Sequence, residues 1–250
     1  MTPVLLALAA GAVVGLALGA LGGGGSVLAV PALIYLLGFS PAAATTASLV
    51  IVVLTSATAL YGHARDGRVR WRAGLAFAAA GAVPALLGGT LAARIPDALL
   101  TAAFAVLAAV VATRMLRAGR PGPAIGERPL RPRRAAGVGA GLGAVTGVLG
   151  VGGGFLAVPA LVTGVGLRMR VAVGTSLLVI TVNSLTALTA RADTTADLDW
   201  SLVAPFAAAA MLAAWDGRRL ATRTSADTLQ RAFAMALLAV SAFMLAEAAL

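Results

Sequence analysis

The sequence predicts an all-α polytopic membrane protein built from two inverted-topology repeats. Three observations predict it: an apolar composition, a glycine-rich block that occurs twice, and loops whose charge bias alternates. Of the 250 residues, 60% are hydrophobic and 11% are charged, whereas a soluble domain carries about 25% charged residues. So few polar groups cannot cover a surface that faces water, and the chain is therefore predicted to lie in a lipid bilayer.

Eight apolar stretches are long enough to cross the hydrocarbon core as helices, which takes roughly 20 residues. Two further apolar pieces, 26–38 and 154–166, have only thirteen residues each. A helix of that length reaches about 20 Å, so both pieces are predicted to be half-helices or tilted partial spans. The first long stretch lacks the positive residues of a signal peptide and is predicted to be retained. The eight stretches are residues 3–21, 41–61, 72–92, 98–116, 135–151, 171–190, 200–215 and 229–249.

An internal repeat relates the two halves of the chain. A shift of 128 positions aligns Gly15–Leu33 with Gly143–Leu161, and 12 of these 19 positions are identical. After one inserted residue the match resumes, so that Phe77 aligns with Phe206. The sequence between the halves is rich in Pro, Gly and Arg, which is typical of a solvated linker. The predicted division is a first membrane repeat over 1–117, a cytoplasmic linker over 118–134 and a second membrane repeat over 135–250.

Loop charges predict how the halves are oriented. The net charge is +10, but arginines that collect in cytoplasmic loops explain it better than nucleic-acid binding does. Loop 62–72 carries four arginines, whereas its counterpart 191–199 carries one arginine and three aspartates. The other equivalent loops also differ in bias, so the halves are predicted to be inverted. Both termini are then predicted outside the cell membrane, with the linker inside. Inverted repeats are a recurring plan of secondary transporters, whose sites lie near the midplane.

The duplicated glycine-rich block predicts a cavity. Backbone groups in lipid must be hydrogen-bonded, so a broken helix at membrane depth must line a protein-enclosed or water-filled space. A new helix is predicted to start just after each block, and its first N–H groups carry partial positive charge and lack intrahelical partners. Glycine lets an anion approach them closely. The alternative is that these glycines only permit tight helix packing. The predicted substrate-binding residues of the blocks are Gly22, Gly24, Gly25, Ser26, Gly150, Gly152, Gly153 and Gly154, and Pro31 and Pro159 are predicted to kink the new helices.

A polar stripe is predicted on each of the equivalent long stretches 41–61 and 171–190. Ser48 and Thr55 lie on one face of the first helix, and Asn183 and Thr186 lie on the equivalent face of the second. These four residues are predicted to line the translocation cavity. The alternative is that each hydroxyl bonds a carbonyl of its own helix.

Several classes of chemistry are not predicted. The sequence has no cysteine and a single histidine, His63, in a loop that carries arginines, so neither a metal site nor any other cofactor is predicted. Catalytic motifs and acidic pairs at membrane depth are missing, which argues against an enzyme. No arginine, histidine, aspartate or glutamate lies in the middle of a predicted span, which leaves the coupling ion open. Asp216, at the end of one span, is predicted to pair with Arg218 or Arg219.

The sequences GALGGGGSVLAVPAL and GVLGVGGGFLAVPAL, followed by ATTASL and AVGTSL, resemble the sulfite exporter TauE/SafE family. The resemblance runs from about Gly11 to Leu245. It implies a plasma-membrane permease or exporter for a small anion, such as sulfite or a sulfur-containing organic anion. The run AAWDGRR at 213–219 departs from the small-residue, glycine-rich run usual in the family. Two alternatives stay open: a non-transporting membrane scaffold or assembly factor, and an anion channel. Substrate, transport direction and oligomeric state are left open as well.

Overall fold

The computed structural model describes most of the chain and is helical wherever it shows regular structure. The residues described are 2–21, 28–92, 94–117, 132–149, 157, 158, 160, 161, 167, 169–191, 195, 198–223 and 226–248. The all-α prediction is confirmed. The elements are α1 (Thr2–Leu21), α2 (Ala29–Pro31), the π-helical η2 (Ala32–Leu36), α3 (Pro41–Arg65), α4 (Trp71–Ala92), α5 (Asp97–Arg117), α6 (Pro132–Leu149), α8 (Met169–Thr189), α10 (Trp200–Arg223) and α11 (Ala226–Ala248).

The ends of α3 show how local sequence sets a helix boundary. Ser40 caps its start by accepting a hydrogen bond from the Ala43 backbone N–H at 3.3 Å, and Pro41 occupies the first turn. The chain turns away after Arg65 through Gly67, whose φ of 67° lies in the left-handed region that glycine adopts without strain. Sequence therefore defines both ends of the longest helix in the described chain.

Each of the eight predicted long stretches corresponds to a long helix, with one clear difference in extent. The stretch 200–215 was predicted to end before the charged residues, but α10 continues to Arg223. Asp216 and Arg219 stay exposed on its surface and form an ion pair at 3.6 Å, as predicted for Asp216. Gly217 packs against the Leu16 carbonyl of α1. The helix therefore continues because its charges point outward while its glycine fits the contact with α1.

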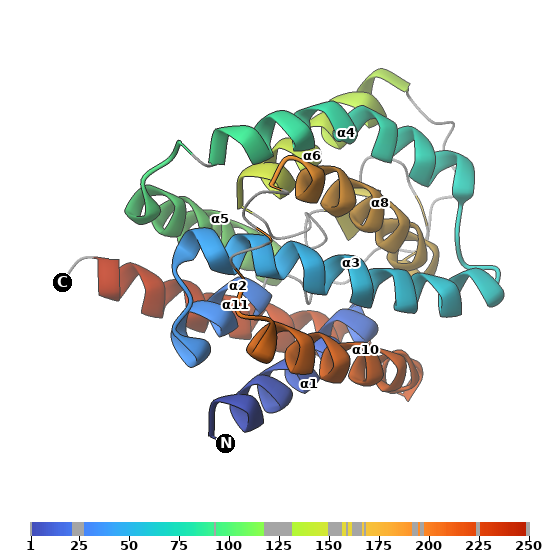
Figure 1. Cartoon of the computed structure of the whole chain (residues 1–250). Helices are drawn as coiled ribbons and strands as arrows, with labels where there is room; N and C mark the ends of the chain where they lie inside the picture. The colour runs from blue at the N-terminus through green and yellow to red at the C-terminus, as the bar shows by residue number, and fades with distance from the viewer. Residues whose placement is uncertain are drawn as a thin grey trace.

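Helices α3 and α8 lie at the centre, with α4 and α6 on one side of the pair and α1 and α10 on the other (Figure 1). The two central helices run antiparallel. Thr45 near the start of α3 contacts Arg191 just after the end of α8, and Ser56 further along α3 contacts Thr181. The two halves of the chain therefore pack against each other, since each of the pairs α1–α10, α4–α6 and α3–α8 joins a helix of the first half to a helix of the second.

Two glycine seams hold the outer helices close. On α1, a methyl group on Gly11, Gly15 or Gly19 would overlap the backbone of α10 at Phe206, Ala210 or Ala214 respectively. The same relation links α6 to α4. There the glycines are Gly139, Gly143 and Gly147, and the opposing residues are Phe77, Gly81 and Ala85. The residues of the second seam are those that the sequence repeat aligns with the first. This match supports a twofold relation between the halves, while their inverted orientation stays a prediction.

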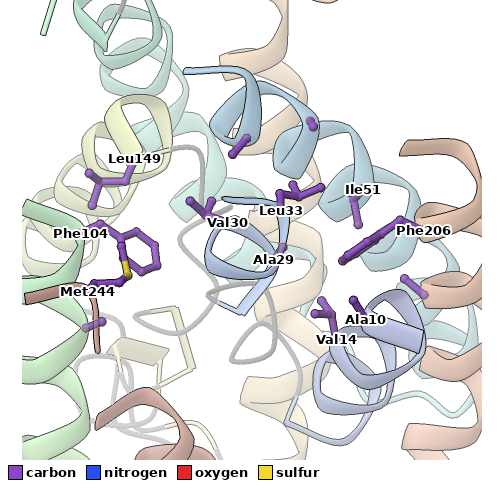
Figure 2. Close-up of a cluster of buried hydrophobic side chains, with 14 of the residues drawn as sticks. Ala10, Val14, Ala29, Val30, Leu33, Ile51, Phe104, Leu149, Phe206 and Met244 are labelled. Atoms are coloured by element: carbon purple, nitrogen blue, oxygen red, sulfur yellow. The ribbon is translucent and has the colours of Figure 1, made fainter. Parts of the chain in front are cut away.

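One side of the short segment after the first glycine block is enclosed by protein, while Leu36 on η2 is 52% exposed. Ala29, Val30 and Leu33 of α2 and η2 are at most 2% exposed. They lie between Ile51 and Phe206 on one side and the side chains of α5, α6 and α11 on the other (Figure 2). A half-helix in lipid would expose backbone groups, so enclosure is what a broken segment requires.

Four of the described helices are long and apolar enough to cross a membrane. They are Thr2–Ala20, Pro41–Arg65, Trp71–Ala92 and Val171–Thr189. Shorter apolar stretches occur within α5 and α6, at Ala98–Arg114 and Ala136–Leu149. Crossing by α5, α6, α10 and α11 stays a prediction.

Candidate functional site

Both glycine-rich blocks fall outside the described residues. This applies to Gly22, Gly24, Gly25, Ser26, Gly150, Gly152, Gly153 and Gly154, and to Pro159. Pro31 is described: it is the buried last residue of α2, and the π-helical turn η2 follows it. A proline cannot donate the hydrogen bond that continues an α-helix. The kink predicted at Pro31 stays a prediction.

The hydroxyls of the predicted stripe bond within their own helices. Ser48 donates to the Thr45 carbonyl at 2.9 Å and Thr55 donates to the Ile51 carbonyl at 2.7 Å. In the second half, Thr186 donates to the Val182 carbonyl at 2.9 Å. Ser48 and Thr55 are fully buried. These bonds match the alternative interpretation of the stripe, although a hydroxyl with one donated bond retains acceptor capacity. Their role in lining a path stays a prediction.

Asn183 differs from those hydroxyls. Its side chain is 1% exposed and lies against Gly81 of α4, where a methyl group would come within 2.7 Å of its Nδ2. Its Oδ1 is buried and has no hydrogen-bond partner within the described part of the chain. An unsatisfied buried amide oxygen costs about 1–3 kcal/mol. Water or a solute that donates a hydrogen bond would recover that energy, so Asn183 is the strongest member of the predicted stripe.

One polar contact between the central helices was not predicted. The hydroxyls of Ser56 and Thr181 lie 2.8 Å apart, and they join α3 to α8. In the sequence Ser56 directly follows Thr55 of the predicted stripe, and Thr181 lies two residues before Asn183. Helix periodicity alone assigns a face and does not say which helix that face meets, so the sequence carried no signal for this pair.

Arg191 was predicted to belong to an outside loop, and the structure instead buries it at 7% exposure. Its Nη1 donates to the Thr45 hydroxyl at 2.6 Å, and its Nη2 donates to the carbonyls of Gly147 at 2.7 Å and Val148 at 3.1 Å. The guanidinium therefore ties the end of α8 to the start of α3 and to the last turn of α6. Burial lowers the pKa of Arg191 to about 10, so the side chain stays charged at pH 7.

His63 holds the equivalent position in the first half, because the repeat shift of 128 positions aligns it with Arg191, and an Ala-Leu pair lies at 59–60 before one residue and at 187–188 before the other. It was predicted in a loop, yet it lies in the last turn of α3, is 5% exposed and packs against Gly174 of α8. The repeat alignment was the signal that pairs these two basic residues. Loop charge counts, by contrast, place both His63 and Arg191 in solvated loops.

A small hollow borders the Arg191 contacts. It has a volume of about 10 Å³, which is at the lower limit for holding one water, and Thr45, Thr101 and Leu149 are among the residues that line it. Phe104, Met244, Leu149 and Val30 surround it between α5, α11, α6 and α2 (Figure 2). The hollow thus lies where α3 begins and α6 ends, next to the partners of the buried guanidinium.

Comparison with known proteins gives a consistent result. The sequence model of the family described as "Sulfite exporter TauE/SafE" matches residues 7–244. A protein of Xylella fastidiosa strain 9a5c named "Probable membrane transporter protein" is 35% identical over 249 residues, which cover 96% of this chain and 94% of that protein. A protein of the same name from strain Temecula1 is 34% identical over 248 residues, again with 96% and 94% covered. No solved structure matches the chain.

Proposed function

We propose that this chain, which belongs to the sulfite exporter TauE/SafE family, is a secondary transporter for a small anion. Membership extends over residues 7–244 and the relatives match over almost their full length, so the chain is a membrane transporter rather than an enzyme. Within that class, the proposed solute is sulfite or a sulfur-containing organic anion. The proposed location is the plasma membrane, and the proposed partners are the lipid bilayer and the small anionic solute, without nucleic acid.

The duplicated glycine-rich block carries the proposal of an anion. The two helix starts predicted after the blocks would supply partial positive charge, which favours an anion by roughly 0.3–1 kcal/mol at exposed sites and up to about 2 kcal/mol when partly buried. The described segment that follows the first block is buried in the centre of the protein. In a site at this position, fixed backbone N–H groups would replace the water molecules that hydrate the anion. The proposed binding residues are the block residues Gly22, Gly24, Gly25, Ser26, Gly150, Gly152, Gly153 and Gly154.

A flux assay with purified protein in liposomes tests the proposal against its alternatives. Sulfite, sulfate, thiosulfate and methanesulfonate are offered outside, and uptake is measured with and without the protein. A secondary transporter gives uptake that saturates with concentration. A scaffold gives no uptake above that of empty liposomes, and a channel gives uptake that does not saturate in the same range.

The orientation of the chain is a separate prediction, because it follows from the arginine bias of the loops. Both termini are expected outside and the linker 118–134 inside. The protein has no native cysteine, so a single cysteine introduced at Arg131 can be labelled without background. An impermeant thiol reagent should not label this cysteine in intact cells. The same reagent should label the cysteine after the cells are lysed. Labelling in intact cells would contradict the proposed topology.

A further inference from the structure

We infer that the turn between α3 and α4 binds the headgroups of anionic phospholipids. The surface comprises residues 61–72, which are the end of α3, the turn itself and the start of α4, and we call it the basic turn. The inference goes beyond the proposed function, because it assigns a lipid partner to a surface of the protein and makes no use of the solute.

The first step is the position of the basic turn relative to a membrane. Helices α3 and α4 are both long and apolar enough to cross a bilayer. A turn between two spanning helices lies at a bilayer surface, where the phospholipid headgroups are. Figure 1 shows this turn at one edge of the helical bundle, where the end of α3 leads into the start of α4. Its side chains are therefore within reach of headgroups.

The second step is the charge of the basic turn. The side chains of Arg65, Arg70 and Arg72 are exposed. A fourth arginine, Arg68, forms an ion pair at 3.6 Å with Asp66, which is the one acidic residue in this part of the sequence. The segment therefore carries a net positive charge. Clusters of four or more basic residues next to a spanning helix attract anionic lipids, and guanidinium groups bind phosphate oxygens in pairs.

The third step is the pair of aromatic side chains in the same surface. Tyr61 is 60% exposed and Trp71 is 51% exposed. Tyrosine and tryptophan gather at membrane–water interfaces, because one end of each ring system is apolar and the other is polar. The guanidinium carbon of Arg65 lies 5.8 Å from the centroid of the Tyr61 ring. The surface thus combines rings that suit the apolar boundary of the bilayer with cations that suit a phosphate.

The fourth step is the fixed backbone of the turn. The Arg70 N–H donates to the Thr175 hydroxyl of α8 at 3.0 Å, and the Arg68 N–H donates to the His63 carbonyl at 3.0 Å. Val69 between them is 8% exposed. A loop that only sets the orientation of the chain requires arginines but no fixed arrangement of them. A docked turn presents its cations in one arrangement, which a binding surface requires.

The second half of the chain supplies a matched comparison. After the one inserted residue the repeat aligns Trp71 with Trp200, and these two residues begin α4 and α10. Trp200 is 48% exposed. The sequence just before it, residues 191–199, carries three aspartates and one arginine, and that arginine is buried. An exposed tryptophan therefore lies next to exposed arginines in the first half and next to aspartates in the second.

The test uses these two tryptophans as fluorescent probes of the neighbouring lipid. The chain has three tryptophans, so Trp200→Phe with Trp215→Phe leaves Trp71, and Trp71→Phe with Trp215→Phe leaves Trp200. Each full-length protein is reconstituted into phosphatidylcholine vesicles. Brominated phosphatidylglycerol or brominated phosphatidylcholine is then added, and both quench a tryptophan that they contact. The two lipids differ in headgroup charge, so the ratio of their quenching gives the preference for an anionic lipid.

The expected preference for phosphatidylglycerol is about tenfold at Trp71 and within about twofold of none at Trp200. Arg65→Gln combined with Arg72→Gln should lower the preference at Trp71 to within about threefold of none. Arg94→Gln removes an exposed arginine outside the basic turn, so the preference should not change. Salt at about 1 M should abolish it, because the Debye length falls to about 3 Å. Thermal unfolding of each variant reports whether it is folded.

Other results would overturn the inference. Equal quenching of Trp71 by both lipids would do so, as would a preference that survives in the folded double glutamine variant. Binding of a short single-stranded RNA through the same arginines, without a lipid preference, would assign the surface to nucleic acid instead. If the single-tryptophan proteins do not fold, the wild type decides: phosphatidylglycerol should raise its unfolding temperature in neutral detergent more than phosphatidylcholine does, and equal shifts overturn the inference. No arm measures transport, so failure here leaves the proposed function intact.

Discussion

The ends of α3 and α8 hold equivalent positions in the two halves of the chain, yet one carries His63 and the other Arg191. Both side chains are buried, at 5% and 7% exposure. Around them, the two glycine seams repeat residue for residue between α1–α10 and α4–α6. The halves therefore share a packing framework and differ in the charge placed at the ends of the central helices. This contrast teaches that the packing between helices is duplicated in this chain, whereas the basic side chain buried at the end of each central helix is not.

The shared framework predicts the largest effect. Gly143→Ala places a methyl group on the Gly81 backbone, and Gly15→Ala does the same at Ala210. Each should cost about 1–3 kcal/mol of stability through overpacking, by similar amounts if the seams are equivalent. The measurement is thermal unfolding in detergent.

Gly141→Ala is the matched control for the seam variants. Gly141 is also on α6, but an added methyl group meets no other atom within 4 Å. The control should match or exceed wild-type stability, because alanine favours a helix over glycine by about 1 kcal/mol. Equal stability of Gly143→Ala and Gly141→Ala would contradict the close packing of α6 on α4. Unequal losses of stability in Gly143→Ala and Gly15→Ala would show that the two seams are not equivalent.

Asn183 and Thr55 sharpen the difference between the halves, since the repeat places them at the same position. Thr55 satisfies its donor within α3, whereas the Asn183 Oδ1 has no partner in the described chain. Asn183→Leu should lower the transport rate about tenfold while the protein remains as abundant as the wild type. Thr55→Val should lower the rate less than Asn183→Leu does, because the Thr55 hydroxyl already bonds the Ile51 carbonyl. The measurement is the initial uptake rate of each variant, normalised to the amount of protein in the liposomes. Equal rates in Asn183→Leu and Thr55→Val would show that Asn183 is not part of the transport path.

The hydroxyl pair between the central helices predicts the smallest effect. Ser56→Ala removes the 2.8 Å contact with Thr181, and hydrogen bonds of this kind between membrane helices contribute about 0.6 kcal/mol on average. The apparent unfolding temperature should fall slightly. Thr58→Val is the control, because that hydroxyl bonds the Leu54 carbonyl of its own helix at 2.8 Å. A control variant that falls as far as Ser56→Ala would show that the contact contributes nothing.

Composition and hydropathy were enough to predict the helices, because a bilayer restricts a spanning chain to closed hydrogen-bonded elements. The repeat also aligned Phe77 with Phe206 and Gly88 with Gly217, which are residues of the two seams. Arg191 could not be placed in the same way. Its burial results from three elements that meet in space, at Thr45, Gly147 and Val148, and loop charge counts treat every arginine as solvated. The extension of α10 past Asp216 was missed for the same reason, since the contact of Gly217 with α1 is a tertiary one.

The central claim is that backbone N–H groups at the duplicated glycine-rich blocks hold the anion, and binding of a matched charged and neutral pair tests it most directly. Methanesulfonate and dimethyl sulfone are similar in size and differ in charge. Their binding is measured calorimetrically on purified wild type, Gly24→Val and Gly152→Val, because a β-branched side chain would fill the space next to the backbone. The account predicts that the wild type binds methanesulfonate and not dimethyl sulfone, and that either valine variant loses this binding while it remains folded. Equal binding of both solutes to the wild type, or full affinity in both folded valine variants, would contradict it.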